Sequence, residues 1–301
     1  KKLTMKKLVY ILWSVLILTS CGRFNNREVD GTKDIRIVSL SKHLTEFTFA
    51  LGKGHDLVGV DWSSTYPDSA KLIKPVGYHR ALNPEGIISI APDVVIHSND
   101  IGPETVLPQI QKAGLKCKAF GNANTIDSAK MLLKELGAFF GVPEKADSLT
   151  KLMDASLTQA TAAAKQLTIK DTPTVMIIHF GRASNVYFVM SGRKGVGDQL
   201  IKMAGAKVAH YDAKGARQVS AEAIAEANPD IIIATDFGYD QMGSMDKFIS
   251  GVPGVSLTKA GKNKRIVRFE EHDLTYYGPR TGNNIMDLMQ LFYPNNNGSK
   301  K

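Results

Sequence analysis

Cysteine is scarce in this sequence of 301 residues, which contains only Cys21 and Cys117. Two cysteines cannot form the several disulfides that hold small secreted domains together. Cys117 lies in the strand-like segment 115–119, where a buried and unreactive thiol is expected. A modified Cys21 would leave Cys117 without a partner, so we expect a fold without intramolecular disulfides.

Metal-binding and catalytic motifs are also missing. The seven histidines form no His-x-x-x-His pair and no histidine-rich acidic loop, which argues against a zinc or manganese site with three or four protein ligands. There is no Gly-x-Ser-x-Gly motif and no P-loop, and the glycine-rich stretch 192–197 is basic and departs from the dinucleotide-binding pattern. These absences favour a protein that is not an enzyme and has no catalytic cofactor.

Long apolar runs are confined to the N-terminus. The run from Leu8 to Leu18 is shorter than the ~20 residues that span a bilayer. It follows four lysines and ends in Leu-Thr-Ser-Cys21, the order of a bacterial lipobox. We therefore predict a lipoprotein signal peptide over residues 1–20, lipid modification of Cys21, and a flexible tether over residues 21–33. The protein is then exported to the periplasmic side of a bacterial membrane and held there by its lipid anchor only.

The excess of positive charge is mild. The formal net charge of +9 falls to +5 without residues 1–20, and the remaining basic residues are spread along the chain. We therefore expect no nucleic-acid partner.

Strand and helix patterns alternate on both sides of a long helical segment. Apolar runs predict strands at 35–40, 57–60, 94–96, 116–119, 174–178, 186–190, 231–233 and 265–269. Helical patterns fall between them, at 45–51, 84–90, 104–113, 197–204 and 283–292. Such alternation is typical of parallel sheets flanked by helices. We predict an α/β fold of two Rossmann-like lobes joined by a single long helix.

The joining helix comes from residues 143–167, where apolar residues recur at helical spacing without a glycine or an internal proline. A helix of ~22 residues spans ~33 Å, enough to cross from one lobe to another. The expected domain boundaries are an N-terminal lobe over 34–143, a connecting helix over 144–168, a C-terminal lobe over 169–296 and a tail over 297–301.

An internal repeat supports two similar lobes. Residues 85–96 align without gaps on residues 222–233, and each stretch contains a glutamate, a short helix, Pro-Asp and an apolar strand. The aligned glutamates, Glu85 and Glu222, each open a helix, where an acidic side chain is favourable in any case.

Several motifs of the chain match a known family. General motifs are Ile37-Val-Ser-Leu40, Pro92-Asp93, Gly141-Val-Pro143 and Pro229-Asp230; narrower ones are Ser64-Thr-Tyr-Pro67, Val76-Gly-Tyr-His-Arg-Ala-Leu82, Gly102-Pro-Glu104 and Gly278-Pro-Arg-Thr281. From Ile35 to Phe292 the chain resembles haem-binding solute-binding lipoproteins of bacterial ABC importers. These belong to the class III periplasmic binding proteins, together with cobalamin- and iron-siderophore-binding proteins. The chain departs from the pattern at His79, where the family more often has methionine, and at Tyr276-Tyr277, where an aliphatic-Gly-Phe run is usual.

The resemblance implies that Tyr78 ligates ferric haem through its phenolate. A phenolate is a hard donor suited to Fe(III), and tyrosine is a known axial haem ligand. A free phenol has a pKa of ~10, which iron and a nearby cation such as Arg80 would lower. The transported ligand is then ferric haem b. Further haem contacts are expected from Arg80, His79, Tyr66, Met190, Phe237, Tyr277 and Arg280.

The histidines compete for the second iron position. Adjacent side chains in an extended segment point apart, so His79 is expected at the rim of the site. His179 ends the first strand of the second lobe and is predicted as a conditional ligand that binds when the lobes close on the porphyrin. His97 also ends a strand and remains an alternative. Surface positions are expected for the other four, His43, His55, His210 and His272.

The resemblance also implies a partner, the permease dimer of a haem importer. An exposed glutamate on each lobe, Glu85 and Glu222, would dock on it, and the chain would act as a monomer. Two alternatives stay open: a ferric siderophore or corrinoid as ligand of the same fold, and an exported lipoprotein enzyme that acts on a tetrapyrrole.

Overall fold

The computed structural model describes residues 35–294 except 168–170, 182–184, 193 and 211–219. The described residues from Arg36 onwards belong to one compact unit. The predicted signal peptide, Cys21, the tether and the tail over 297–301 lie outside the described residues. No helix in the described part of the chain is long and apolar enough to cross a membrane.

The first lobe is built on a four-stranded parallel sheet. Its strands are β1 (Ile37–Ser39), β2 (Leu57–Val60), β5 (Val94–His97) and β6 (Lys116–Ala119), in the spatial order β2-β1-β5-β6. The central strands are apolar and buried on both faces, as strands covered by helices on both sides must be. The sequence predicted all four strands.

Helices and a small hairpin complete this lobe. The helices are α2 (Lys42–Ala50), α3 (Pro84–Ile88), α4 (Val106–Lys112) and α5 (Ile126–Phe139), and the hairpin pairs β3 (Gly77–Tyr78) with β4 (Ala81–Leu82). The sequence interpretation missed α5, although Thr125 and Ser128 form a capping box at its start.

The second lobe has a five-stranded mixed sheet. Its strands are β7 (Thr174–Gly181), β8 (Val186–Val189), β9 (Lys207–Val208), β10 (Ile231–Thr235) and β11 (Ile266–Phe269). The order is β11-β10-β7-β8, and β9 also pairs with β7. Only β8 is antiparallel, since it follows β7 through a short connection.

Six helices accompany this sheet within the described ranges. They are α7 (Val196–Met203), α8 (Ala221–Ala227), α9 (Asp236–Met242), α10 (Met245–Gly251), α11 (Lys259–Lys262) and α12 (Thr281–Phe292). The sequence interpretation missed α9, α10 and α11, and it also missed the short strand β9.

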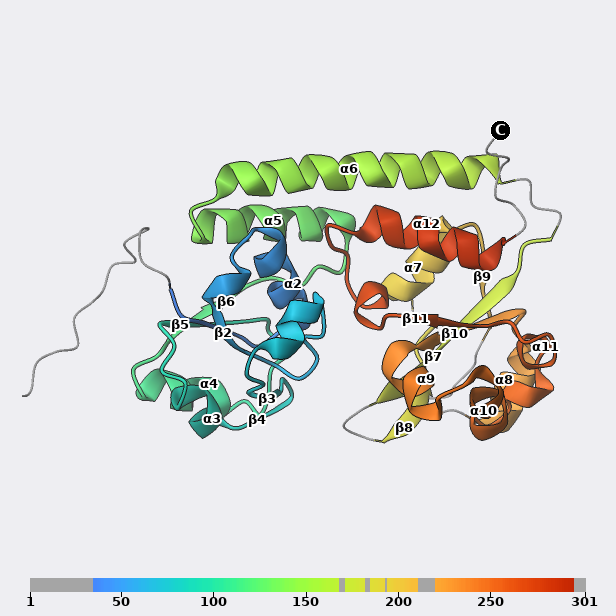
Figure 1. The fold of residues 1–301 in the computed structure, drawn as a ribbon, viewed down its shortest axis with the longest axis horizontal. Helices are drawn as coiled ribbons and strands as arrows, with labels where there is room; N and C mark the ends of the chain where they lie inside the picture. The colour runs from blue at the N-terminus through green and yellow to red at the C-terminus, as the bar shows by residue number, and fades with distance from the viewer. Residues whose placement is uncertain (1–34, 168–170, 182–184, 193, 211–219, 295–301) are drawn as a thin grey trace, which may run out of the picture. The chain divides into compact units, whose positions relative to one another are not determined.

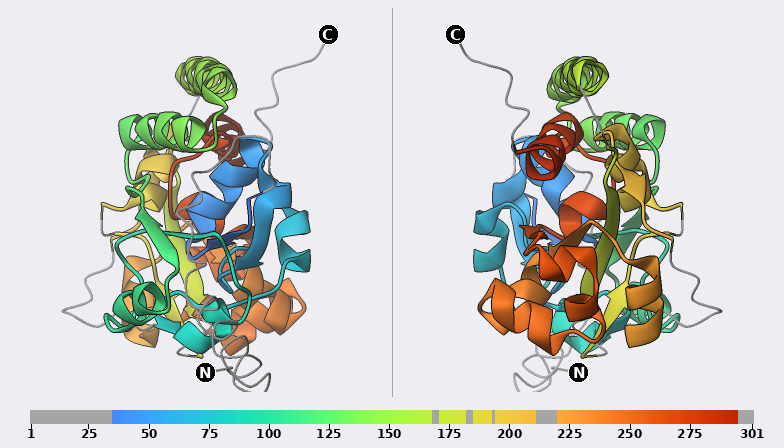
Figure 2. Two further views of the ribbon diagram at one scale, coloured as in Figure 1. Left: turned by 90° about the vertical axis from the view of Figure 1, so that its left-hand side faces the viewer. Right: turned by 90° about the vertical axis from the view of Figure 1, so that its right-hand side faces the viewer.

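One long helix, α6 (Pro143–Gln166), passes over both lobes (Figure 1). Seen end-on, it lies above α5 of the first lobe and α12 of the second (Figure 2). A Cβ atom on Gly137 of α5 would lie 2.4 Å from Cβ of Ala146, and one on Gly282 of α12 would lie 2.4 Å from the carbonyl carbon of Ser156. Glycine at both positions therefore allows α6 to pack closely on each lobe, and the predicted joining helix is confirmed.

Candidate ligand-binding site

The predicted iron ligand, Tyr78, sits on a hairpin that is tied down on both sides. Gly77 before it has a φ of +114°, a backbone conformation that favours glycine. The Gly77 carbonyl accepts a hydrogen bond from the Trp62 backbone N–H at 2.9 Å, and the His79 carbonyl accepts one from the Gly102 N–H at 2.8 Å. The Tyr78 side chain itself is only half-buried.

The His79 ring lies beside the Tyr78 ring, with centroids 4.5 Å apart and planes tilted by 60°. Its Nδ1 is 3.3 Å from Oδ2 of Asp61, and its Nε2 is 3.8 Å from Oδ2 of Asp100. The expectation that the two side chains point apart and that His79 sits at the rim is therefore wrong. The two residues stand at a hairpin turn, where the alternation of an extended strand does not apply.

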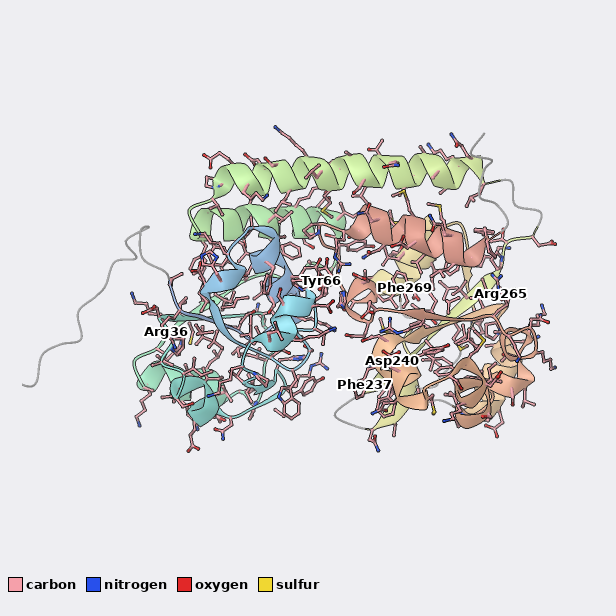
Figure 3. All side chains as sticks on the ribbon, in the orientation of Figure 1. Arg36, Tyr66, Phe237, Asp240, Arg265 and Phe269 are labelled. Atoms are coloured by element: carbon pink, nitrogen blue, oxygen red, sulfur yellow. The ribbon has the colours of Figure 1, made fainter. Side chains whose placement is uncertain are left out.

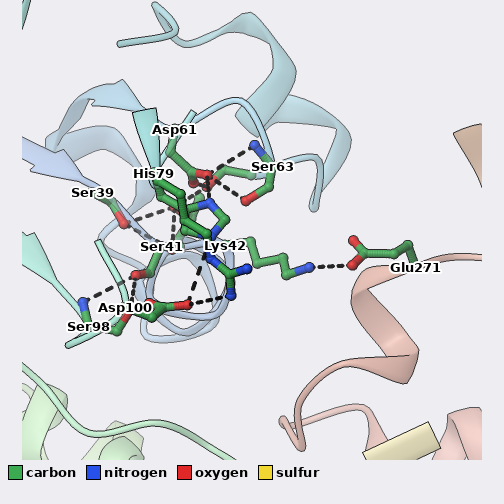
Figure 4. Close-up of polar contacts among 12 residues, drawn as sticks. Ser39, Ser41, Lys42, Asp61, Ser63, His79, Ser98, Asp100 and Glu271 are labelled. Atoms are coloured by element: carbon green, nitrogen blue, oxygen red, sulfur yellow. Dashed lines mark hydrogen bonds and ion pairs between the residues drawn. The ribbon is translucent and has the colours of Figure 1, made fainter. Parts of the chain in front are cut away.

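Asp61 anchors this group and lies above His79 in Figure 4. Its side chain is fully buried and accepts hydrogen bonds from the Ser63 backbone and hydroxyl and from the Ser64 hydroxyl, at 2.5–3.1 Å. Ser64 in turn bonds to Thr45 of α2. A buried carboxylate needs such donors because burial without them is costly.

Arg80 and Asp100 form the exposed side of the group. Their closest atoms, Nη2 and Oδ2, are 3.7 Å apart, and the two side chains are 59 % and 44 % exposed. Burial raises the pKa of Asp100, but the Ser98 hydroxyl and the charges of His79 and Arg80 together hold it below its usual value. Arg80 is thus loosely paired and can turn towards an anionic group of a ligand.

A second polar group joins the two lobes near Tyr66. The Tyr66 ring stacks on His272 with centroids 5.0 Å apart, and the Arg280 guanidinium lies 3.6 Å from the Tyr66 centroid. Figure 3 labels Tyr66 on the flank of the first lobe that makes these contacts. Arg280 also pairs with Glu46 at 3.0 Å and with Asp273 at 2.5 Å. Burial lowers the pKa of Arg280, but the two carboxylates more than offset this and raise it above its usual value.

The tyrosine pair before Gly278 is buried. The Tyr276 hydroxyl donates a 2.5 Å hydrogen bond to Glu46, and burial raises the Tyr276 pKa well above its usual value. Tyr277 is 5 % exposed, and burial raises its pKa as well. The structure thus places Arg280 in an ion-pair network and Tyr277 in the interior; their contact with a ligand stays a prediction.

His179 lies at the carboxyl end of β7. Its Nδ1 is 3.2 Å from the Thr235 hydroxyl, and its ring is half-buried. Two other predicted contacts come from the same lobe: Met190 follows β8, and Phe237 starts α9 with its ring 5.8 Å from Phe180. All three are half-buried. His179 and Phe237 lie at the carboxyl ends of the parallel strands β7 and β10, where ligands of open α/β sheets bind. Met190 follows the antiparallel β8 and donates its backbone N–H to the Ile177 carbonyl, so it lies towards the amino end of β7 and away from this edge.

A further ion pair connects the lobes close to His179. Nζ of Lys42, at the start of α2, lies 2.6 Å from Oε1 of Glu271, which follows β11. Burial raises the pKa of Glu271, but the positive charges of Lys42 and His179 overcome this and bring it to about 2. The sequence offered no sign of this pair, because 229 residues separate its members.

Three histidines are more buried than the sequence suggested. His43 and His272, expected at the surface, are 8 % and 3 % exposed, so that expectation is wrong for both. Burial lowers the pKa of His43 to about 4 and also lowers that of His272. His97 is buried with its Nδ1 3.0 Å from the Ser98 carbonyl. His55 and His210 are exposed, as expected.

The two predicted docking glutamates occupy equivalent places in the lobes. Glu85 lies in the first turn of α3 and Glu222 in the first turn of α8, and both side chains are exposed. Each helix begins at a capping side chain, Asn83 or Ser220. The Ser220 hydroxyl also lowers the pKa of Glu222. Both glutamates are therefore available to a partner.

Two further features of the described residues concern possible binding sites. A cavity of about 430 Å³ in the second lobe is lined by Gly192, Lys194, Asp198, Lys202, Val208, Ala209 and His210, none of which is a predicted haem contact. No group of three or more His, Cys, Asp or Glu residues in these ranges is arranged to hold a metal ion.

Sequence reasoning also missed Trp62. This residue is 61 % exposed and bonds through its backbone N–H to Gly77 of the Tyr78 hairpin.

The chain is similar to several known proteins along most of its length. The family pattern described as "Periplasmic binding protein" matches residues 37–272. An uncharacterised ABC transporter substrate-binding lipoprotein of Bacillus subtilis, YvrC, is 29 % identical over 90 % of this chain and 84 % of its own. A vitamin B12-binding protein of Pectobacterium atrosepticum is 26 % identical over 66 % of this chain and 70 % of its own.

A solved structure with a similar fold is the periplasmic heme-binding protein RhuT from Roseiflexus sp. RS-1, in apo form. Its TM-score is 0.76 and its identity 32 %, and the match covers 86 % of this chain and 98 % of RhuT.

Proposed function

Because the chain belongs to the periplasmic binding protein family, whose members are solute-binding components of ABC transporters, we propose that it carries ferric haem b to a haem importer. The observation that carries this proposal is Tyr78: a half-buried tyrosine on a fixed hairpin, next to a loosely paired arginine. Tyrosine ligates ferric haem in known proteins. The similarity to RhuT supports haem as the ligand.

The other predicted contacts have the character that a haem site needs. Phe237 provides apolar surface for the macrocycle, and Arg80 provides a cation for a propionate or for the phenolate. The Tyr66 ring already contacts His272 and Arg280, so haem would meet it at its edge. His179 remains the proposed conditional ligand from the second lobe, and its Thr235 bond would hold the ring orientation. Haem then lies between the N-terminal lobe over 34–143 and the C-terminal lobe over 169–296.

A corrinoid is the second candidate ligand. It is favoured by the vitamin B12-binding relatives, of which that of Pectobacterium atrosepticum is one. A corrinoid site does not require a tyrosine with access to iron, so Tyr78 separates the two candidates.

The test is an absorbance titration of the purified protein with hemin and, separately, with cyanocobalamin. We expect hemin to give a high-spin ferric Soret band and a phenolate charge-transfer band. Tyr78→Phe should remove that band and weaken binding roughly 10–100-fold. Tyr293→Phe is the matched control. Tyr293 directly follows α12, and its hydroxyl donates to the Gly205 carbonyl of the second lobe, so it is not a predicted haem contact. Saturable binding of cyanocobalamin without hemin binding would reject haem.

The same hemin titration, repeated at several pH values, tests His179 as the second protein ligand of the haem iron. Acidification should convert a tyrosine–histidine spectrum into a tyrosine-only one, and His179→Ala should abolish this transition while hemin still binds. A variant that titrates like the wild type would leave His179 with a structural role.

We also propose that the protein acts as a monomer, held by its lipid anchor, and docks on the permease dimer through Glu85 and Glu222. Both are exposed in the first turn of equivalent helices. Removing both carboxylates should leave hemin affinity unchanged and lower uptake into vesicles that contain the cognate permease. Each lost charged contact costs about 1–3 kcal/mol at the interface. Normal uptake by the Glu85→Ala, Glu222→Ala double variant would refute the docking role.

A further inference from the structure

The orientation of the Tyr78 ring depends on its neighbours. Among the residues that the structure describes, no hydrogen-bond partner is found for the Tyr78 hydroxyl, and the ring is half-buried. Its position is therefore set by the hairpin backbone and by the contact with the His79 ring, whose centroid is 4.5 Å away. A residue that holds the His79 ring in place also holds Tyr78.

His79 is held at both of its ring nitrogens. Nδ1 faces Asp61 at 3.3 Å, and Nε2 faces Asp100 at 3.8 Å. The His79 side chain is only 12 % exposed, and the side chain of Asp61 is fully buried. Since both nitrogens face carboxylates, the imidazole is engaged within the protein.

The two carboxylates belong to different loops at the carboxyl edge of the sheet. Asp61 directly follows β2, and Asp100 lies three residues beyond the end of β5. The His79 carbonyl adds a third link, a 2.8 Å hydrogen bond from Gly102. Figure 4 shows His79 between Asp61 and Asp100. His79 thus ties the hairpin to both loops.

We propose that His79 is the positioning residue for Tyr78: clamped by Asp61 and Asp100, it supports the phenol ring from the side and aims the hydroxyl at the iron of the ligand. This inference rests on the proposed haem-binding function. A tyrosine side chain that coordinates iron must lie within a narrow range of distance and angle, and a rigid support beside it keeps it there.

The test compares hemin complexes of the wild type, His79→Phe, His79→Gln and Asp61→Asn. Phenylalanine keeps a ring beside Tyr78 but loses both carboxylate contacts, whereas glutamine can still donate to Asp61. We expect His79→Phe and Asp61→Asn to shift the phenolate charge-transfer band and weaken hemin binding about tenfold. His79→Gln should recover much of both. His55→Phe is the matched control, because His55 is exposed and lies on the turn before β2.

The outcomes separate this inference from the function on which it rests. If the wild type shows no phenolate band with hemin, the proposed function fails. If the wild type shows the band and His79→Phe keeps it unshifted with affinity within about twofold, His79 has no positioning role. Thermal unfolding of each variant identifies a folding defect. Should His79→Phe not fold, Asp100→Asn gives the same comparison with the buried Asp61 intact, and an unshifted band there overturns the proposal.

Discussion

Two polar groups near the carboxyl edge of the first sheet differ in how firmly they are held. The hairpin group consists of Asp61, His79, Arg80 and Asp100. Its members are linked to one another at 3.3–3.8 Å, and all but Asp61 are partly open to solvent. The joint group consists of Glu46, Asp273, Tyr276 and Arg280, which are linked at 2.5–3.3 Å and are largely buried.

The difference separates a group that stabilises the fold from one that can accept new partners. A buried, bidentate arginine–carboxylate network is costly to open, because each charge would be left unpaired in the interior. The joint group therefore holds the first lobe against the segment between β11 and α12. Within the hairpin group, only the exposed Arg80–Asp100 pair can be exchanged for contacts with a ligand at little cost.

The largest expected effect on stability comes from removing the ion pairs of the joint group. Arg280→Met should lower the free energy of unfolding by about 3–5 kcal/mol, since Glu46 and Asp273 would keep buried charges without a partner. Urea unfolding at neutral pH measures this loss. The matched variant in the hairpin group is Arg80→Met, which should cost less than about 1 kcal/mol because Arg80 is exposed. Equal losses in the two variants would remove the distinction between the groups.

A smaller effect on stability is expected when the pH changes, because His43 titrates. The His43 ring lies 5.7 Å from the ring of Tyr276 in the joint group. Burial lowers the pKa of folded His43 from 6.5 to about 4. Between these values the unfolded chain binds a proton that the folded chain excludes. Stability should therefore fall as pH drops from 6.5 towards 4, by up to about 3 kcal/mol from this residue.

The check is urea unfolding of the wild type and of His43→Gln at several pH values in this range. The variant cannot titrate at this position, so the difference between the two profiles isolates His43. Parallel profiles would mean that folded His43 accepts its proton as readily as the unfolded chain does.

The sequence predicted the lobes better than the contacts between them. Apolar runs located the strands, and the helical spacing over 143–167 located α6. It missed α5, whose capping box is a signal that lies within four residues and was available. It also placed His79 at the rim, because the two-residue period of a strand was applied to a hairpin turn. Tyr78 was singled out through its family motif, but the hairpin that carries it was not predicted.

What the sequence determined by itself is local: alternation of strand and helix, turn glycines, capping residues, and the repeat that makes Glu85 and Glu222 equivalent. These depend on residues a few positions apart, so each can be recognised without knowing the fold. The tertiary structure decided which charges meet. Lys42 and Glu271 are 229 residues apart, and Glu46 and Arg280 are 234 apart. Such pairs, and the burial of His43 and His272, arise only when α6 and the packed lobes bring distant segments together, because burial and Coulomb attraction depend on distance in space and not on separation along the chain.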